Sequence, residues 1–327
     1  MNEKRRVTMK DIAKETGYSI NTVSLALKGI NTAPETREKI LKAADELGYI
    51  GNSIASSMRS GSTQNLAIIV GDISNLHFGR VIKTAVNIWN SHNYNALIYN
   101  TNEQPDYERK AIVSAFQQNV AGILISPVKR DDENFKLLKK SGIPFVSFGS
   151  PCDDPEISSV TLNDEKGGYI ATKYLIDRGH KKILFLNANG NIWRLNGYRR
   201  AMEEHGLPLI DSNILQFDLN SEFDWTNIQY QICYRLDYTA IVAFNDMVAM
   251  RVFQFLQEDS SNKKISVNDI VAFDNIFEAF HLPFSIPSVS HSSIDISLAA
   301  PQLLLDQLES GDFTPKKIVL DVKLYLH

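Results

Sequence analysis

From residue 66 to residue 273, short apolar runs alternate with segments of helix length. The runs are typical of buried strands: LAIIV, ALIY, GILIS, PFVSF, ILFL, AIVAF and DIVAF. Strands that alternate with helices predict parallel sheets joined by right-handed crossovers. Because these strands are too many for one comfortable sheet, we expect two doubly wound lobes, with any ligand in the cleft at the carboxyl ends of their strands.

Residues 8–50 have a different pattern, that of three short helices. Thr8 and Asp11 have capping-box spacing, and the first helix is predicted to end at Gly17. Ser19 caps the second helix, and Pro34 is a good first residue for the third. A helix, a tight turn that contains glycine and a second capped helix together predict a helix-turn-helix.

The second helix carries apolar residues on two sides. Val23 and Leu27 are four residues apart, as a core-facing stripe requires. On the other side, Ile20, Asn21 and Leu25 can enter a DNA major groove. Thr22 and Ser24 can contact phosphates. The spacing alone also fits a helical hairpin at a protein interface, and that alternative stays open at this point.

Charge and composition separate this N-terminal piece from the rest of the chain. Residues 1–60 contain ten Lys or Arg and seven Asp or Glu, a net charge of +3, which leaves −7 on the remainder. The stretch GNSIASSMRSGSTQN at 51–65 is rich in Ser and Gly and is typical of a linker. We therefore predict an α/β protein with a headpiece at 1–50, a hinge at 51–64 and a two-lobed domain at 65–327.

Long motifs add a family resemblance to this reading. VTMKDIAKETGYSINTVSLALKG and TREKILKAADELGYIGN resemble the headpiece of the lac-repressor and galactose-repressor family of bacterial transcription regulators. The similarity continues through GGYIATKYLIDRGHKKILFL, RLNGYRRAM, TAIVAFNDMVAM and DIVAFDN. The resemblance implies a repressor that binds a pseudo-palindromic double-stranded DNA operator as a homodimer. It also implies a periplasmic-binding-protein-like domain that holds a small-molecule effector, with a sugar or sugar phosphate as the family expectation.

The resemblance assigns DNA contacts residue by residue. Three residues fall at the base-reading positions of the second helix: Ile20, Asn21 and Leu25. Asn21 is the best candidate for a hydrogen-bonded base, because asparagine pairs bidentately with adenine. Residues 52–59, which include Arg59, match a hinge helix, and Met58 falls where the family usually inserts a leucine into the minor groove.

This chain departs from the family pattern at three positions near these contacts. Gly51 replaces a common proline and Ser56 a common arginine, which should leave the hinge looser or less cationic. Ala33 replaces a usual capping serine before Pro34, which should lower helix stability by about 1 kcal/mol.

The resemblance also places a set of residues around the effector: Phe78, Arg194, Trp225, Asn245, Asp246 and Asp274. Carboxylates accept hydrogen bonds from hydroxyl groups, Arg and Asn donate or bridge, and an aromatic ring covers an apolar sugar face. Asp246 is equally readable as a helix cap, and either Trp225 or Leu219 can supply a second apolar wall. Loops such as NLHF at 75–78 and Asn163 with Asp164 depart from the family, so a purine or a phosphoprotein corepressor also stays open as the effector.

Other functional classes are disfavoured by the motifs. We find no GxGxxG, P-loop, GxSxG or HExxH pattern, so no catalytic residue, cofactor or metal site is predicted. An exported sugar-binding protein would share the two lobes, but the headpiece and the lack of an export signal argue against it. Two distant cysteines and the absence of an apolar run near 18 residues favour a reducing cytoplasm and no membrane span. The C-terminal LYLH carries no heptad tail, so we expect a dimer and no tetramer.

Overall fold

The computed structural model of the chain describes residues 7–50, 63–128, 133–151, 154–188, 191–235, 237–258 and 265–326. Met1–Ser62 and Thr63–His327 form two compact units. The predicted hinge positions Gly51, Ser56, Met58 and Arg59 lie outside the described residues.

The first unit contains three helices: α1 (Met9–Thr16), α2 (Ile20–Lys28) and α3 (Pro34–Glu46). At the start of α1, the Asp11 carboxylate accepts hydrogen bonds from the Thr8 backbone N–H at 2.8 Å and from its hydroxyl at 2.7 Å. Both α1 and α2 end at glycines in the left-handed conformation. The helices enclose a small core of buried side chains: Ile12, Val23, Ala26, Ile40, Ala43 and Ala44.

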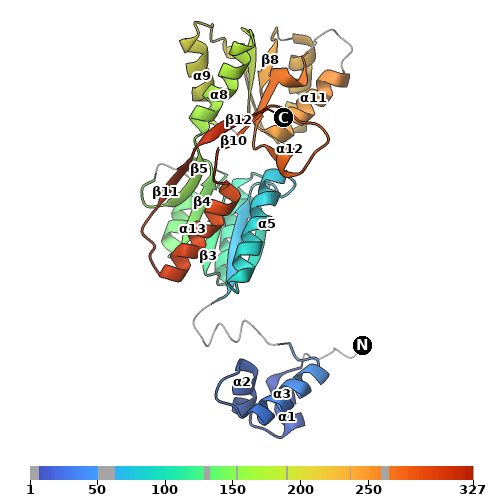
Figure 1. Ribbon diagram of the computed structural model, residues 1–327, viewed down its shortest axis with the longest axis vertical. Coiled ribbons are helices and arrows are strands. Elements are labelled where there is room, and N and C mark those ends of the chain that lie inside the picture. The colour runs from blue at the N-terminus through green and yellow to red at the C-terminus, as the bar shows by residue number, and fades with distance from the viewer. Residues whose placement is uncertain are drawn as a thin grey trace. The chain divides into compact units, whose positions relative to one another are not determined.

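Lobe 1 of the second unit is a sheet of order β11-β5-β4-β3-β1-β2 with every neighbouring pair parallel. Helices α5 and α13 pack on one face of this sheet, and α6 and α7 pack on the other (Figure 1). The strands are β1 (Asn65–Val70), β2 (Asn95–Asn100), β3 (Gly122–Ile125), β4 (Phe145–Gly149), β5 (Ser158–Leu162) and β11 (Lys317–Leu320). The helices are α5 (Leu76–Ser91), α6 (Pro105–Gln117), α7 (Glu133–Ser141) and α13 (Ile296–Ser310).

Lobe 2 is a sheet of order β12-β10-β9-β8-β6-β7. Its strands are β6 (Ile183–Ala188), β7 (Ile214–Phe217), β8 (Ala240–Val242), β9 (Ile270–Phe273), β10 (Ser288–His291) and β12 (Val322–Tyr325). Its helices are α8 (Asp164–Asp177), α9 (Ile192–Glu204), α10 (Glu222–Tyr230), α11 (Asp246–Glu258) and α12 (Ile276–Ala279). A π-helical turn follows α10 at Gln231–Arg235, and short 3-10 helices lie at Asp211–Asn213 and Val267–Asp269.

The strand pattern confirms the two predicted lobes and corrects the expectation of purely parallel sheets. Strand β12 pairs with β10 in the antiparallel direction. The chain crosses between the lobes after β5, after β10 and after β11, so each lobe contains segments that are distant in the sequence (Figure 1). Three connections place the strand ends of both lobes along one cleft.

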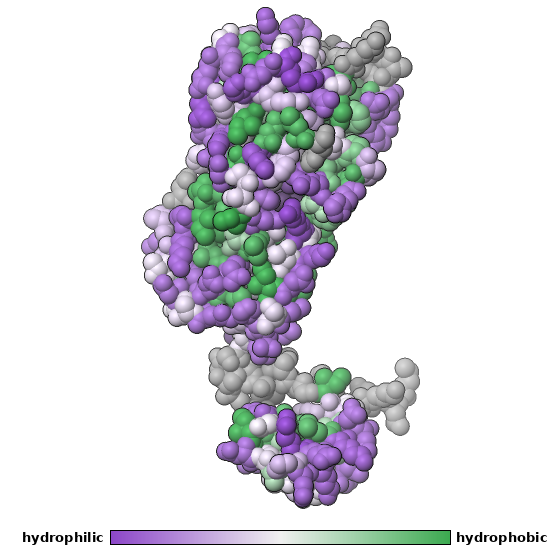
Figure 2. Space-filling view, viewed as in Figure 1, coloured by the Kyte–Doolittle hydropathy of each residue, from purple (hydrophilic) through white to green (hydrophobic). Residues whose placement is uncertain are grey.

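The surface is mixed in character. On the face shown in Figure 2, hydrophilic residues line the margins of both lobes and hydrophobic residues gather within those margins. Among the described residues, no helix has the length and apolar character needed to cross a membrane.

Candidate functional site

A cavity of about 350 Å³ lies between the two lobes. This volume is at the lower end of the range for small-molecule sites. Its walls come from the carboxyl ends of parallel strands and from the helix starts that follow them, as expected for doubly wound sheets. Lobe 1 contributes Asn75, His77, Phe78, Glu103, Ser126 and Gly149, and lobe 2 contributes Asp164, Asn191, Arg194, Leu219, Phe244, Asn245 and Asp274.

Four of the six residues predicted from the sequence line this cavity: Phe78, Arg194, Asn245 and Asp274. Phe78 lies in the first turn of α5 and contacts Phe148 edge to face, with 6.2 Å between ring centroids. Asn245 precedes α11, and its Oδ1 accepts a hydrogen bond from the Val248 N–H at 2.9 Å. The amide therefore caps its own helix while it faces the cavity.

Arg194 is held firmly by the protein itself. The residue is 9% exposed, and its Nε donates to Asp164 Oδ1 at 3.0 Å. Its Nη1 donates to the Phe244 carbonyl oxygen, and the guanidinium lies 4.0 Å from the centroid of the Phe273 ring. Two hydrogen bonds and the ring contact fix the plane of the guanidinium before any ligand arrives.

Two glycines allow this arrangement by bringing α8 and α9 into backbone contact. A Cβ atom on Gly168 would lie 2.1 Å from the Arg194 carbonyl oxygen. A Cβ atom on Gly197 would lie 2.0 Å from the Glu165 carbonyl oxygen. Both distances are far below van der Waals contact, so any side chain at either position would force the helices apart and move Arg194 away from Asp164.

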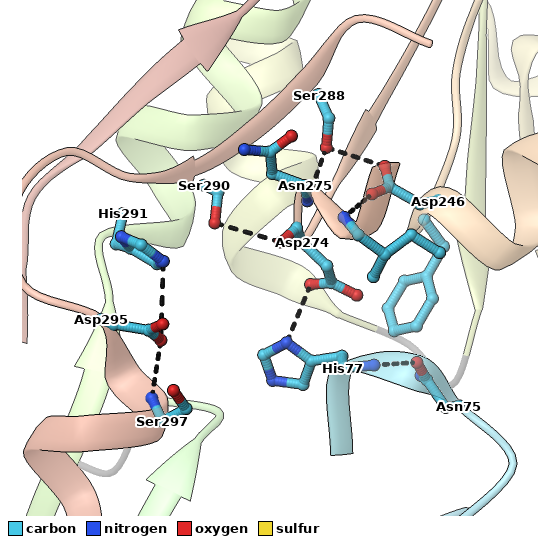
Figure 3. A network of polar contacts seen from close by, with 12 residues as sticks. Asn75, His77, Asp246, Asp274, Asn275, Ser288, Ser290, His291, Asp295 and Ser297 are labelled. Atoms are coloured by element: carbon cyan, nitrogen blue, oxygen red, sulfur yellow. Dashed lines mark hydrogen bonds and ion pairs between the residues drawn. The ribbon is translucent and has the colours of Figure 1, made fainter. Parts of the chain in front are cut away.

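Asp274 reaches the cavity from the end of β9. Figure 3 shows its carboxylate facing His77 of lobe 1, with 3.9 Å between Oδ1 and the imidazole Nδ1. Both Asp274 and Asn275 have positive φ angles, 99° and 53°. Left-handed backbone is uncommon for residues other than glycine and concentrates at functional sites, where surrounding contacts hold it in place.

Asp246 does not line the cavity, which corrects its assignment to the effector. The side chain is fully buried and accepts hydrogen bonds from the Ile276 N–H at 2.8 Å and the Ser288 hydroxyl at 2.7 Å (Figure 3). Burial raises the pKa of the Asp246 carboxyl well above its ordinary value, and the charge of Asp274 raises it further. The alternative reading as a cap was closer, although the helix that Asp246 caps is α12 and not its own.

Trp225 is also outside the cavity, and its assignment was wrong. Its indole is buried in lobe 2 against Phe217 and Phe255, with the Arg251 guanidinium 4.1 Å from the ring centroid. The indole Nε1 donates to the Leu219 carbonyl oxygen at 2.9 Å. Leu219, the alternative considered for this wall, is the residue that faces the cavity.

Glu103 is a cavity residue that the sequence interpretation missed. It follows β2 in lobe 1, and a Cβ atom on Gly71 would lie 1.8 Å from its Oε1. Burial, then the charges of Asp72 and Asp218, raise the pKa of Glu103 to about 7. Its place three residues after the end of β2 was the available signal, since ligand sites lie beyond the carboxyl ends of parallel strands.

The headpiece presents the second helix as predicted. Val23 is fully buried, and Leu27 packs against the same core while half-buried. Ile20 is 45% exposed, and Asn21 is also exposed. The remaining residues assigned to DNA are half-buried: Thr22, Ser24 and Leu25. The N-terminus of α2 is closed by Ser19, whose Oγ accepts from the Thr22 N–H at 3.1 Å.

Both units match known families. Residues 8–52 match the family model described as bacterial regulatory proteins, lacI family. Residues 63–308 match the model described as periplasmic binding proteins and sugar binding domain of LacI family. Catabolite control protein A of Priestia megaterium is 30% identical over 304 residues, which are 91% of each chain. The transcriptional repressor PurR of Vibrio atlanticus is 28% identical over 93% of each chain.

Solved structures share the fold. A lac repressor dimer bound to operator and an anti-inducer superposes with a TM-score of 0.79 at 19% identity over 98% of each chain. A complex of the transcriptional regulator CelR with cellobiose gives a TM-score of 0.69 at 22% identity and covers 98% of this chain and 99% of that one. With both units matched and a relative aligned along nine-tenths of its length, the chain belongs to the lacI family of bacterial regulatory proteins and is a DNA-binding transcriptional regulator, not an enzyme.

Proposed function

We propose that this regulator is a cytoplasmic repressor that binds a pseudo-palindromic operator as a homodimer and responds to a small polar effector in the cleft. The observation that carries the proposal is the division of α2 into two sides. Val23 and Ala26 are buried in the headpiece core, while Ile20 and Asn21 face solvent in the position of a recognition helix.

The exposed side of α2 has the chemistry needed to read bases. The Asn21 amide can bond bidentately to the N6 and N7 atoms of adenine, and Ile20 and Leu25 can contact thymine methyl groups. Thr22 and Ser24 carry hydroxyls that can donate to phosphate oxygens and fix the register of the helix on the duplex. Specificity therefore depends on few hydrogen bonds, with Asn21 as the main one.

Homodimerisation follows from the small size of one headpiece. A single recognition helix covers too few base pairs for genomic specificity, and two copies on a two-fold axis double the site. Strand β2 is an edge of the lobe 1 sheet, and its Ile98 side chain is 47% exposed. An exposed apolar edge strand supports an interface with a second copy of the chain.

Effector control is supported by the cavity's position between the lobes. Besides the approach of His77 to Asp274, the Asn220 Nδ2 donates across the cleft to the Asn102 carbonyl oxygen at 3.0 Å. A ligand that contacts both lobes shifts the population between interlobe arrangements when its affinity for them differs. The fold relative whose structure holds cellobiose supports a sugar as the ligand class.

The first test is selection of bound sequences from random duplex DNA with the full-length protein at physiological salt. A two-fold symmetric consensus is expected, and sizing of the protein on that duplex should give two chains. Retention of DNA without a consensus would leave only phosphate contacts and would refute the assignment of α2 as a sequence reader. One chain per site, or four, would refute the dimer.

A further inference from the structure

The helix starts that face the cleft are already capped by the protein. Asparagine side chains cap four of these helix starts, each accepting from a backbone N–H of its own helix: Asn75 for α5 at 3.0 Å, Asn163 for α8 at 3.0 Å, Asn191 for α9 at 3.0 and 3.2 Å, and Asn245 for α11 at 2.9 Å. Helix N-termini bind phosphate and carboxylate through such N–H groups. Here a neutral amide oxygen occupies part of that position, so an anionic ligand finds fewer free N–H groups at these helix starts.

The positively charged Arg194 side chain in the cavity is already paired with a carboxylate of the protein. Arg194 is the one Lys or Arg side chain among the cavity-lining residues that the structure describes. Its Nε bonds to Asp164 at 3.0 Å, and both side chains are nearly buried. In the low dielectric of a buried site, this carboxylate offsets most of the guanidinium charge that an anionic ligand would meet.

The remaining carboxylates in the described lining come from both lobes. Glu103 belongs to lobe 1 and Asp274 to lobe 2. Glu103 has Asp72 and Asp218 as charged neighbours, and both are negative. Within the described residues, Asp274 has one ion-pair contact, with the His77 imidazole at 3.9 Å. A phosphate or carboxylate on the ligand would be repelled from both sides.

We propose that the cleft selects an uncharged polyhydroxylated ligand, a free sugar or polyol, over its phosphorylated or carboxylated analogue, and that Glu103 is a specificity-determining residue for this selection. The proposal rests on the effector function proposed above. It narrows the expectation of a sugar or sugar phosphate to the uncharged member of that pair.

The cavity residues can donate hydrogen bonds to, and accept them from, the hydroxyl groups of an uncharged ligand. Glu103 and Asp274 offer carboxylate oxygens as acceptors. No partner within the described part of the chain holds the Nδ2 groups of Asn75 and Asn245, so both can donate. Apolar sugar faces meet the cavity's carbon-rich walls: Phe78, Leu219 and Phe244.

The primary experiment compares matched ligand pairs on the full-length protein by isothermal titration calorimetry at pH 7.5. The pairs are glucose with glucose 6-phosphate, ribose with ribose 5-phosphate, N-acetylglucosamine with its 6-phosphate, and glucose with glucuronate, together with cellobiose and mannitol as further uncharged probes. At least one uncharged compound is expected to bind, at least tenfold more tightly than its charged analogue where the panel contains one. Tighter binding of any charged partner, or no binding by any uncharged compound, would overturn the proposal.

The role of Glu103 is tested with Glu103→Gln, which removes the charge and keeps the shape. The affinity ratio between the uncharged and charged members of a pair is expected to narrow at least twofold, because the carboxylate no longer repels the anion. Glu203→Gln, an exposed position on α9 that does not line the cavity, is the matched control and should keep the wild-type ratio. An unchanged ratio in Glu103→Gln would remove Glu103 from the selection.

A pH series separates charge from shape. Glucuronate stays ionised between pH 6 and 8, so a loss of its affinity as pH rises reports ionisation of protein groups. The loss should exceed twofold in the wild type and be smaller in Glu103→Gln, because the pKa of Glu103 is about 7. The neighbouring charged or titratable groups Asp72, Asp218 and His77 are present in both proteins, so the comparison isolates the contribution of Glu103. Equal pH profiles would overturn the role of Glu103.

A failure of the proposed ligand selection can be distinguished from a failure of the proposed repressor function. Binding of a charged ligand that still alters operator affinity would overturn the selection and leave the repressor intact. Absence of a DNA consensus with normal sugar selectivity would do the reverse. Thermal unfolding of each variant verifies that the fold is retained before binding is interpreted.

Discussion

The headpiece and the interlobe cleft place their functional side chains in opposite environments. On α2, two of the residues assigned to base contacts, Ile20 and Asn21, are exposed, and the third, Leu25, is half-buried. In the cleft, Arg194 is 9% exposed and bonded to Asp164 and to the Phe244 carbonyl oxygen. Substitutions on α2 should therefore change DNA recognition without changing the stability of the headpiece. At much of the lobe 2 wall, substitutions that change ligand binding should also change stability.

The largest effect that tests this contrast is expected for Gly197→Ala. The new Cβ would meet the backbone of α8, with the Glu165 carbonyl oxygen at 2.0 Å and the Tyr169 nitrogen at 2.5 Å. Because backbone atoms cannot rotate away, we expect a loss of about 3 kcal/mol or more in the free energy of unfolding, with loss of effector binding. Urea denaturation of the full chain measures the first and calorimetry the second.

Gly79→Ala is the matched control for that variant. Gly79 lies within α5, and an added Cβ would have no atom within 4 Å. Alanine is the better helix former by roughly 0.5–1 kcal/mol, so this change should leave stability equal or higher. Similar destabilisation by both substitutions would mean that helix contact between α8 and α9 is not the cause.

A somewhat smaller loss is expected for Asp246→Ala. Removing the carboxylate leaves the buried Ile276 N–H and the Ser288 hydroxyl without their acceptor, which should lower the free energy of unfolding by about 2–4 kcal/mol. Urea denaturation gives this value directly. Ligand contact is not removed, so effector affinity in the folded fraction should change less than stability does.

Asp274→Asn is to be compared with Asp246→Ala, because Asp274 lines the cavity whereas Asp246 is buried behind it. Asparagine tolerates the positive φ at this position, so the variant should fold and bind operator normally. It should lose most of the effector response, because the proposed hydroxyl acceptor becomes neutral. If Asp246→Ala abolishes the response while Asp274→Asn preserves it, the assignment of the two aspartates is reversed.

The sequence predicted the elements whose signal is local. The alternation of apolar runs and helical segments predicted both lobes, and the capping spacing of Thr8 with Asp11 and of Ser19 predicted the headpiece helices. Strand β5, SSVTL, was missed because its buried face carries hydroxyls and not only apolar residues. Ser158 is satisfied there by Gln307 of α13, a partner 149 residues away that no local pattern reveals.

The cleft residues were predicted only in part, because tertiary contacts between distant segments leave no local sequence pattern. Arg194, Asn245 and Asp274 follow strands and were assigned from motifs that run along the chain. Whether Asp246 or Trp225 faces the cavity depends on the rotation of α11 and α10 against their sheet, which spacing within one helix does not fix. Glu103 becomes a cleft residue only because Gly71 leaves room for its carboxylate, a tertiary contact between neighbouring strand ends.

On the headpiece side of the comparison, Asn21→Ala should change recognition without changing the fold. The side chain is exposed, so the free energy of unfolding should stay within about 0.5 kcal/mol of the wild type. Operator affinity should fall by about 1–3 kcal/mol with relaxed preference at one base pair per half-site, read from repeated DNA selection. Ser24→Ala, at a proposed phosphate contact, should instead weaken binding evenly across sequences, and the same even loss in Asn21→Ala would identify Asn21 as a phosphate contact.

The smallest effect is the one that sharpens the contrast most cleanly, because it should raise headpiece stability without touching the recognition side. Ala33 occupies the N-cap of α3 and makes no side-chain cap, although Pro34 follows at the first helical position. Ala33→Ser supplies a hydroxyl acceptor for the first turn and should stabilise the headpiece by about 1 kcal/mol. Thermal unfolding followed by the assigned NMR signals of Tyr18 and Tyr49, which pack against the headpiece core, reports this unit. The DNA consensus should stay unchanged, since α3 carries none of the assigned base contacts; an altered consensus would show that recognition and stability are coupled in the headpiece after all.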